Sequence, residues 1–274
     1  MGHRNSRRMR SVACASVWSP SSSAGPHWPG SSRYPGPRCT ISRPGETGGI
    51  SLALRDYLFH EEPGITLYCG DCRDVLPLLD SVDAVITDPP YGLSGSSGTI
   101  NRARARAIYR GEWRDDLRAV QEVFAPSIRE ALSRAKRGAV IPGTPHCFEY
   151  PKPDDIAAII QPASHGMSKW GRATWQPVLL YGRDPRLGLT IQSLTYQSNG
   201  QHFPSEHPCP KADDVARWLV ARATEPGEII LDPFCGSGTF LRAAKDAARR
   251  AIGIEIEPKY CEIAVRRLRQ EVLL

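Results

Sequence analysis

The chain has 274 residues, of which 41% are hydrophobic and 23% charged, a composition typical of a globular protein with a full core. Its net charge of +6 does not by itself indicate nucleic-acid binding, because residues 1–50 carry seven arginines and one acid and the remainder is neutral. The sequence has no apolar run of about 18 residues, the length that a membrane-spanning helix needs.

The N-terminal segment is predicted to be disordered. Residues 19–49 contain six prolines, six glycines and seven serines, with almost no periodic apolar content. Such a composition cannot bury enough apolar surface to offset the entropy of ordering the chain. We therefore expect a disordered tail over residues 1–50 and a single folded domain over residues 51–274.

The folded part is predicted to alternate strands and helices. Its first half is predicted as strand, short helix, strand, long helix and strand, at residues 65–69, 74–79, 82–86, 116–136 and 138–141. Its second half is predicted as helix, strand, helix, strand, helix, strand and helix, at residues 156–160, 175–181, 211–223, 228–232, 240–250, 251–255 and 258–268. The closing strand–helix–strand unit is typical of a parallel sheet, so we expect an α/β fold with a Rossmann-like, mostly parallel sheet and helices on both faces.

The strand predicted at 82–86 stops at an acid, two prolines and an aromatic residue, which are Asp88, Pro89, Pro90 and Tyr91. Proline has no N–H for a sheet ladder, so the strand has to end there. Open parallel sheets bind their ligands at the carboxyl ends of their strands. The stretch is therefore a candidate site, and the alternative is a plain turn after a buried strand.

A glycine-rich loop joins a predicted strand to a predicted helix near the C-terminus. Gly236 and Gly238 allow the backbone to turn sharply and to approach a ligand at the start of the helix. Glu255 ends the next strand, where an acid can accept both hydroxyls of a ribose. The third glycine of a dinucleotide site is replaced by Leu241, and Asp232 would repel a pyrophosphate and attract an amino group. The pattern favours a nucleoside with an amino tail, such as S-adenosylmethionine, over a dinucleotide.

Several segments resemble the amino DNA methyltransferases. The two signature motifs of that family are similar to Asp-Pro-Pro-Tyr at 88–91 and Asp-Pro-Phe-Cys-Gly-Ser-Gly-Thr at 232–239. Gly-Asp-Cys at 70–72 and His-Pro-Cys-Pro-Lys at 207–211 resemble two further family segments, and residues 175–182 resemble one of its strands. The catalytic motif precedes the cofactor motif, which is the order of the circularly permuted beta class.

The resemblance implies direct methyl transfer from S-adenosylmethionine to the exocyclic amine of a base flipped out of DNA. Asp88 and the backbone carbonyl of Pro89 are expected to accept the amine hydrogens and to aim the nitrogen lone pair at the methyl group. Tyr91 is expected to stack on the base, and Pro90 to keep the turn stiff. The residues expected to bind the cofactor are Asp71, Cys72, Pro208, Lys211, Asp232, Phe234, Gly236, Gly238, Thr239 and Glu255.

Arginines follow the catalytic motif in a long loop predicted at residues 92–114. Four of them are expected to contact DNA phosphates, and these are Arg102, Arg104, Arg106 and Arg110. The alternative for this loop is a solvated segment in which neighbouring acids pair with the arginines. Residues 183–206 are expected to be a short target-recognition segment, unless the loop after Tyr91 shares that work.

The expected partner is double-stranded DNA, and the expected location is the cytoplasm of a bacterium, with the gene carried by the bacterium or a phage. Cys69 and Cys72 have no second cysteine pair, so no metal site is expected. No membrane association is expected. A cognate restriction endonuclease, and the choice between monomer and homodimer, are left open.

Adenine is favoured over cytosine as the target, because an Asp rather than a Ser precedes Pro-Pro-Tyr. Cytosine-N4 methylation is the first alternative. RNA or protein-glutamine methylation is less favoured, since Asn commonly replaces Asp88 in those enzymes and their cofactor motif comes first. A non-catalytic DNA-binding module predicts a damaged motif, whereas both motifs are intact.

Overall fold

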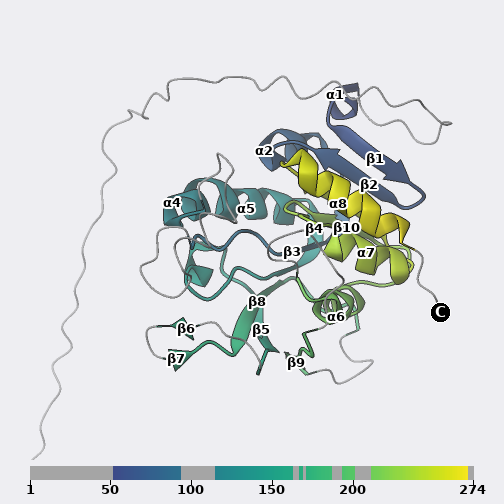
Figure 1. The fold of residues 1–274 in the computed structure, drawn as a ribbon. Coiled ribbons are helices and arrows are strands. Elements are labelled where there is room, and N and C mark those ends of the chain that lie inside the picture. Colours follow the sequence, from purple (N-terminus) through teal and green to yellow (C-terminus); the bar gives the residue numbers. More distant parts are fainter. Residues whose placement is uncertain are drawn as a thin grey trace, which may run out of the picture. The chain divides into compact units, whose positions relative to one another are not determined.

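The computed structural model describes residues 52–93, 115–162, 167–168, 171–186, 193–200 and 211–270, all within the compact unit Cys39–Leu274 (Figure 1). The disorder predicted for residues 1–50 lies outside the described residues. The same holds for nearly all of the loop at 92–114 and for part of the segment at 183–206. No helix in the described ranges is long and apolar enough to cross a membrane.

In the described chain, nine strands form one mixed sheet in the order β1-β2-β11-β10-β3-β4-β8-β5-β9. The five strands from β2 to β4 in that order are parallel, whereas β1 and β8 run antiparallel to their neighbours β2, β4 and β5. The strands are β1 Leu58–Glu62, β2 Ile65–Cys69, β3 Val82–Thr87, β4 Ala135–Val140, β5 Asp155–Ile160, β8 Trp175–Tyr181, β9 Thr195–Gln197, β10 Ile229–Asp232 and β11 Arg250–Glu255. A separate hairpin pairs β6 Met167–Ser168 with β7 Gly171–Arg172. This confirms the predicted α/β fold class.

Helices cover both faces of the sheet. The larger ones are α5 Ala125–Ser133, α6 Asp213–Ala223, α7 Thr239–Asp246 and α8 Pro258–Arg269. The shorter ones are α1 Leu52–Arg55, α2 Cys72–Val75, η1 Leu76–Leu78, α4 Leu117–Ala119, η2 Val120–Phe124 and η3 Cys147–Glu149. Helices α6, α7 and α8 share one core cluster with the sheet, and α2, η1 and α5 pack on clusters at the other face.

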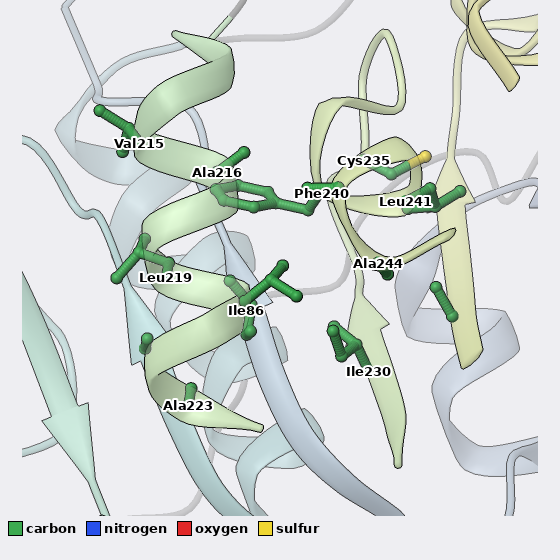
Figure 2. Close-up of a cluster of buried hydrophobic side chains, with 14 of the residues drawn as sticks. Ile86, Val215, Ala216, Leu219, Ala223, Ile230, Cys235, Phe240, Leu241 and Ala244 are labelled. Carbon is green, nitrogen blue, oxygen red and sulfur yellow. The ribbon is translucent and has the colours of Figure 1, made fainter. Parts of the chain in front are cut away.

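The core shows why these strands occupy the centre. Ile86 of β3 and Ile230 of β10 are fully buried, in the same core cluster as Leu219 of α6 and Phe240 of α7, and Figure 2 shows Ile86 near Leu219. Full burial of each such side chain contributes about 1.5–3 kcal/mol. Val85, the residue before Ile86, points to the opposite core cluster, as the alternation of a strand requires.

Strands β3 and β10 are parallel neighbours, but the chain leaves them toward opposite sides of the sheet. From β3 the chain continues to β4 on one side, whereas from β10 it continues through α7 to β11 on the other side. Such a divergence creates a ligand site beyond the carboxyl ends of the two strands. The two predicted motifs follow β3 and β10, so the topology brings both to this point.

One helix prediction was wrong, and a second helix is shorter and less regular than predicted. Residues 156–160, predicted as a helix, form β5, because its short apolar run alternates between buried and less buried positions and pairs with β8 and β9. The helix predicted over 116–136 divides into α4, the wider π-type turn η2 and α5, and it ends at Ser133. Strand β4 begins at Ala135, earlier than predicted, because Val82 and Ala84 of β3 pair with its first half.

Smaller differences occur at other elements. Strands β1 and β9 were not predicted, because β1 is an edge strand rich in polar residues and β9 has three residues. The short helix predicted at 74–79 begins earlier, as α2, and continues into the tighter turn η1. The hairpin of β6 and β7 and the short helices α1 and η3 were not predicted either. The other strands and helices lie where predicted, apart from shifts of a few residues at their ends.

Candidate active site

The structure joins the two predicted motifs directly. The hydroxyl of Thr87, at the end of β3, donates a hydrogen bond to Asp232 Oδ1, at the end of β10, over 2.7 Å. Both residues are buried, with exposures of 0% and 1%. This bond fixes the start of the Asp-Pro-Pro-Tyr turn against the start of the glycine loop.

Asp88 is the centre of a polar cluster. Its Oδ1 accepts a hydrogen bond from the Tyr91 hydroxyl over 2.6 Å, and its Oδ2 lies 3.0 Å from the Lys211 ammonium. Lys211 also donates to the Tyr91 oxygen over 2.8 Å and to Gln176 Oε1 over 3.2 Å. The cluster thus combines the Asp-Pro-Pro-Tyr turn, strand β8 and Lys211, which lies two residues before α6.

Tyr91 lies against a glycine of the neighbouring strand connection. Gly143 follows β4, has φ of 69°, and a Cβ built on it would lie 2.7–3.0 Å from three ring carbons of Tyr91. Atoms that close cannot coexist, so the ring keeps its position only because residue 143 has no side chain. Gly143 was not predicted as a site residue, and its positive φ cannot be read from the sequence.

We expect Gly143→Ala to reduce methyl transfer by about tenfold or more, because the new methyl group displaces the Tyr91 ring from Asp88. Gly227→Ala is the matched control, since it also has a positive φ, of 85°, but has open space around its Cβ. Both variants should lose stability in thermal unfolding because of the positive φ, Gly143→Ala more because of the clash, and only Gly143→Ala should lose activity. Equal activity in the two variants would contradict the role of the Gly143–Tyr91 contact.

The glycine loop folds as a tight connection from β10 to α7. Gly236 and Gly238 have φ of 51° and 73°, the left-handed region that favours glycine. A Cβ on Gly238 would also lie 2.9 Å from the Ala264 side chain of α8. The Gly236 N–H donates to Glu255 Oε2 over 2.9 Å, so the loop is tied to the end of β11.

The two acids beside the loop lie in a low-dielectric site. Burial raises the pKa of Asp232 to about 7, against the Thr87 hydroxyl and the Phe234 N–H that favour its charged form. Burial also raises the pKa of Glu255 to about 7, against backbone N–H groups that include those of Glu257 and Gly236. In the described residues neither acid has an ion-pair partner. A cationic ligand would supply the missing positive charge.

Arginines beneath the loop were missed by the sequence analysis. Arg267 of α8 is 4% exposed and donates hydrogen bonds to Ser237 Oγ and Thr239 Oγ1, at the start of α7. Arg242 of α7 donates to the Arg267 carbonyl over 2.8 Å. On a helical pattern such arginines are expected to be exposed, and only the packing of α7 on α8 shows that they brace the loop.

The acidic turn after β2 lies next to the loop. The Gly70 N–H donates to the Glu255 carbonyl over 2.9 Å, which brings Asp71 to the same edge as Glu255. Asp71 caps α2 by accepting from the Arg73 N–H, and it also pairs with the Arg73 guanidinium. The Cys72 thiol is buried and donates to Ser127 Oγ, and burial raises its pKa to about 11. Any contact of Cys72 with a ligand at this edge therefore uses its backbone.

Some predicted site residues lie outside the described residues, and these are Pro208, Arg102, Arg104, Arg106 and Arg110. The two ends of the loop that contains the arginines are nevertheless placed. The Gly92 N–H donates to the buried Asp115 carboxylate, and His146 Nε2 lies 3.3 Å from the Gly92 carbonyl. The loop thus leaves and rejoins the domain directly beside Tyr91. No group of His, Cys, Asp or Glu in the described ranges is arranged to hold a metal ion.

Comparisons with known proteins agree with this architecture. A sequence model of the family described as DNA methylase matches residues 149–266. The Type II methyltransferase M2.MboI of Moraxella bovis is 23% identical over 250 residues, which are 79% of this chain and 92% of that protein.

Two solved structures share the fold. The M1.HpyAVI–SAM complex has a TM-score of 0.51 at 18% identity, covering 74% of this chain and 99% of that one. The cytosine-N4-specific PvuII DNA methyltransferase has a TM-score of 0.56 at 14% identity, covering 77% and 88%. With the two predicted motifs adjacent at the switch point of a fold shared with these two methyltransferases, the chain is similar in sequence to the DNA methylase family of adenine-N6 and cytosine-N4 enzymes.

Proposed function

We propose that this protein is a site-specific adenine-N6 DNA methyltransferase of the permuted beta class, which transfers a methyl group to a flipped adenine in double-stranded DNA. The observation that carries the proposal is the placement of Asp88 beside the Asp232 loop, joined through Thr87. A carboxylate that accepts N–H donors lies next to a loop that suits a cationic nucleoside. The acceptor for the amine and the loop for the cofactor thus lie at the same edge of the sheet.

The cofactor is S-adenosylmethionine, as in the family. The residues present fit it, because two acids without a described cation, the buried Asp232 and the half-buried Glu255, flank a loop whose glycines leave room for close approach. Glu255 is proposed to accept from the ribose and Asp232 to receive the amino tail. Gly236, Gly238 and Thr239 are proposed to line the loop, with Asp71, Cys72 and Phe234 near the adenine and Pro208 and Lys211 near the methionine part.

We expect cofactor affinity to rise as pH increases from about 6 to 8. The pKa values of Asp232 and Glu255 are both raised to about 7, so below that pH both carboxyls are largely neutral and hold a cation poorly. Each acid that must ionise lowers the affinity by up to about tenfold per pH unit below its pKa. Titration calorimetry in buffers of different ionisation enthalpy measures the protons released. A Kd that stays constant over this pH range would contradict the assignment of these acids.

The bound cofactor supplies an electrophilic methyl group on a sulfonium. Asp88 and the Pro89 carbonyl are proposed to accept the two hydrogens of the target amine, which turns its lone pair toward that methyl group. The amine nitrogen would bond to the methyl carbon as the carbon–sulfur bond breaks, with a neutral thioether leaving and one amine hydrogen lost as a proton toward Asp88, so no side-chain nucleophile is required. Tyr91 is proposed to hold the ring of the base, and Pro90 to keep the turn rigid.

DNA contact is proposed for the loop that starts and ends beside Tyr91. Since Asp115 holds Gly92, the arginines at 102, 104, 106 and 110 belong to a segment tethered at both ends to the catalytic turn. Phosphate contacts from such a segment would position the duplex over Asp88. Residues 183–206 are proposed as a short target-recognition segment. We place the enzyme in the cytoplasm of a bacterium, with the gene carried by the bacterium or a phage.

Digesting DNA from a host that expresses the protein, and separating the nucleosides by mass, tests the choice of base. N6-methyladenine is the expected product, because an Asp precedes Pro-Pro-Tyr. N4-methylcytosine alone would replace the adenine assignment by the cytosine one, which the fold of the PvuII enzyme also accommodates. Sequencing the same DNA for modified bases gives the recognition site.

A further inference from the structure

Lys211 has a position that its expected role at the cofactor does not explain. Its side chain is 9% exposed and its ammonium has three polar partners, Asp88, Tyr91 and Gln176. An ammonium group has three N–H donors, so these partners use its full capacity. The partners come from the catalytic turn and from β8, which fixes the ammonium at the catalytic carboxylate.

The pair of Lys211 and Asp88 forms a donor beside an acceptor. The ammonium nitrogen and Asp88 Oδ2 are 3.0 Å apart, and the other carboxylate oxygen is held by the Tyr91 hydroxyl. The Watson–Crick edge of adenine has the complementary pattern, an N6 amine that donates and a ring N1 that accepts. Cytosine has the same pattern at N4 and N3. In guanine and thymine the ring nitrogen on this edge carries a hydrogen and cannot accept.

The acidic groups around Lys211 favour its remaining in place when the target base enters the site. Asp88 and Glu255 both lie close enough to Asp232 to disfavour its ionisation, so three acids gather here. Among the described residues, Lys211 is the one cation that lies within ion-pair distance of Asp88, Asp232 or Glu255. Moving it away would leave Asp88 as a poorly hydrated carboxylate without a counter-charge, which is costly. Contact with the base from its present place requires that one N–H turn from Gln176, the longest of its three contacts at 3.2 Å, toward the ring.

We propose that Lys211 donates a hydrogen bond to the ring nitrogen next to the target amine, so that Asp88 and Lys211 together read the amine and ring nitrogen of the flipped base. This inference rests on the proposed function, because it requires that Asp88 accepts the amine. It makes Lys211 a base-contacting residue that selects adenine or cytosine over the other two bases. A pocket of this kind reads a flipped base by its Watson–Crick edge.

The test is a cycle that combines a protein variant with a modified base. Duplexes carry adenine, 1-deazaadenine or 7-deazaadenine at the mapped target position, and wild type is compared with Lys211→Met by kcat/KM. For wild type we expect 1-deazaadenine to lose about tenfold or more relative to 7-deazaadenine, the usual effect of a hydrogen bond to a charged group. For Lys211→Met the values of kcat/KM for the two analogues should differ by less than about threefold, apart from the difference in intrinsic reactivity of their amines. Replacing a ring nitrogen with carbon also changes the intrinsic reactivity of the amine. This change is the same for wild type and Lys211→Met, so it cancels when the two enzymes are compared.

An equal penalty for 1-deazaadenine in both enzymes would overturn the contact. If Lys211→Met fails to fold, as seen by loss of a cooperative thermal unfolding transition, wild type alone decides, because equal methylation of 1-deaza- and 7-deazaadenine excludes a needed contact at N1. Lys211→Arg, which keeps the charge and the donors, should restore part of the discrimination. Failure of wild type to methylate the unmodified adenine duplex would instead refute the proposed function. If cytosine is the target, 3-deazacytosine takes the place of 1-deazaadenine.

Discussion

Replacing Asp88 with alanine is expected to lower the rate of methyl transfer by about 1,000-fold or more and to leave cofactor affinity within about twofold. The carboxylate is proposed to accept one of the two amine hydrogens, and loss of one positioned hydrogen-bonding group costs about 100- to 1,000-fold. The substitution also leaves the Lys211 ammonium without its counter-charge. Single-turnover methylation and equilibrium cofactor binding measure the two effects separately.

Asp83→Ala is the matched control for this prediction. Asp83 lies on the same strand, accepts from the Ile229 N–H and pairs with Lys136, so its loss should lower stability but not the rate of transfer. Asp88→Asn should retain cofactor binding and lose most of the activity, because its amide keeps one acceptor and places a donor against Lys211. Near-normal turnover in Asp88→Ala would show that the turn does not act as proposed.

Replacing Glu255 with alanine is expected to weaken cofactor binding by about 100-fold. Two groups of interactions are lost together, the proposed contacts with the ribose hydroxyls and the bonds that hold the loop. In the structure Oε2 accepts from the Gly236 N–H and Oε1 from the Glu257 N–H, both over 2.9 Å. Each lost hydrogen bond to a charged group contributes about 1.5–3 kcal/mol, although the contributions are not additive.

Glu255→Gln separates the two contributions to binding. The amide retains an acceptor for one backbone N–H, so we expect a smaller loss, of about tenfold. Glu257→Gln is the control, because its side chain lies next in the turn and contacts Lys259 at the limit of an ion pair. Calorimetric titration of all three variants gives the order of affinities. An unchanged Kd in Glu255→Ala would contradict the ribose assignment.

The sequence allowed the centre of the fold to be predicted because strong local signals coincide there. At Val82–Thr87 and Ile229–Asp232 a buried apolar run ends at an acid and a proline, which fixes both the strand and its carboxyl end. Strand β5 was predicted wrongly because a run of five apolar residues has no period that separates strand from helix. Its identity depends on pairing with β8, which is a tertiary property.

The sequence predicts only those parts of the site that follow from a motif or from the order of the strands along the chain. Asp88, Asp232 and Glu255 meet at one edge because they end neighbouring parallel strands. The contact of Lys211 with Asp88 joins residues far apart in the sequence, and nothing near Lys211 indicates that partner. The dependence of Tyr91 on the missing side chain of Gly143 likewise appears only once β3 and β4 are packed side by side.

The most direct measurement follows the methyl group itself. Purified full-length protein is incubated with methyl-labelled S-adenosylmethionine and unmodified duplex DNA, in parallel with Asp88→Ala, and the DNA is digested to nucleosides. The account predicts label in N6-methyldeoxyadenosine for the wild type and almost none for the variant. Label found only in RNA or protein, or equal labelling of DNA by both proteins, would contradict it.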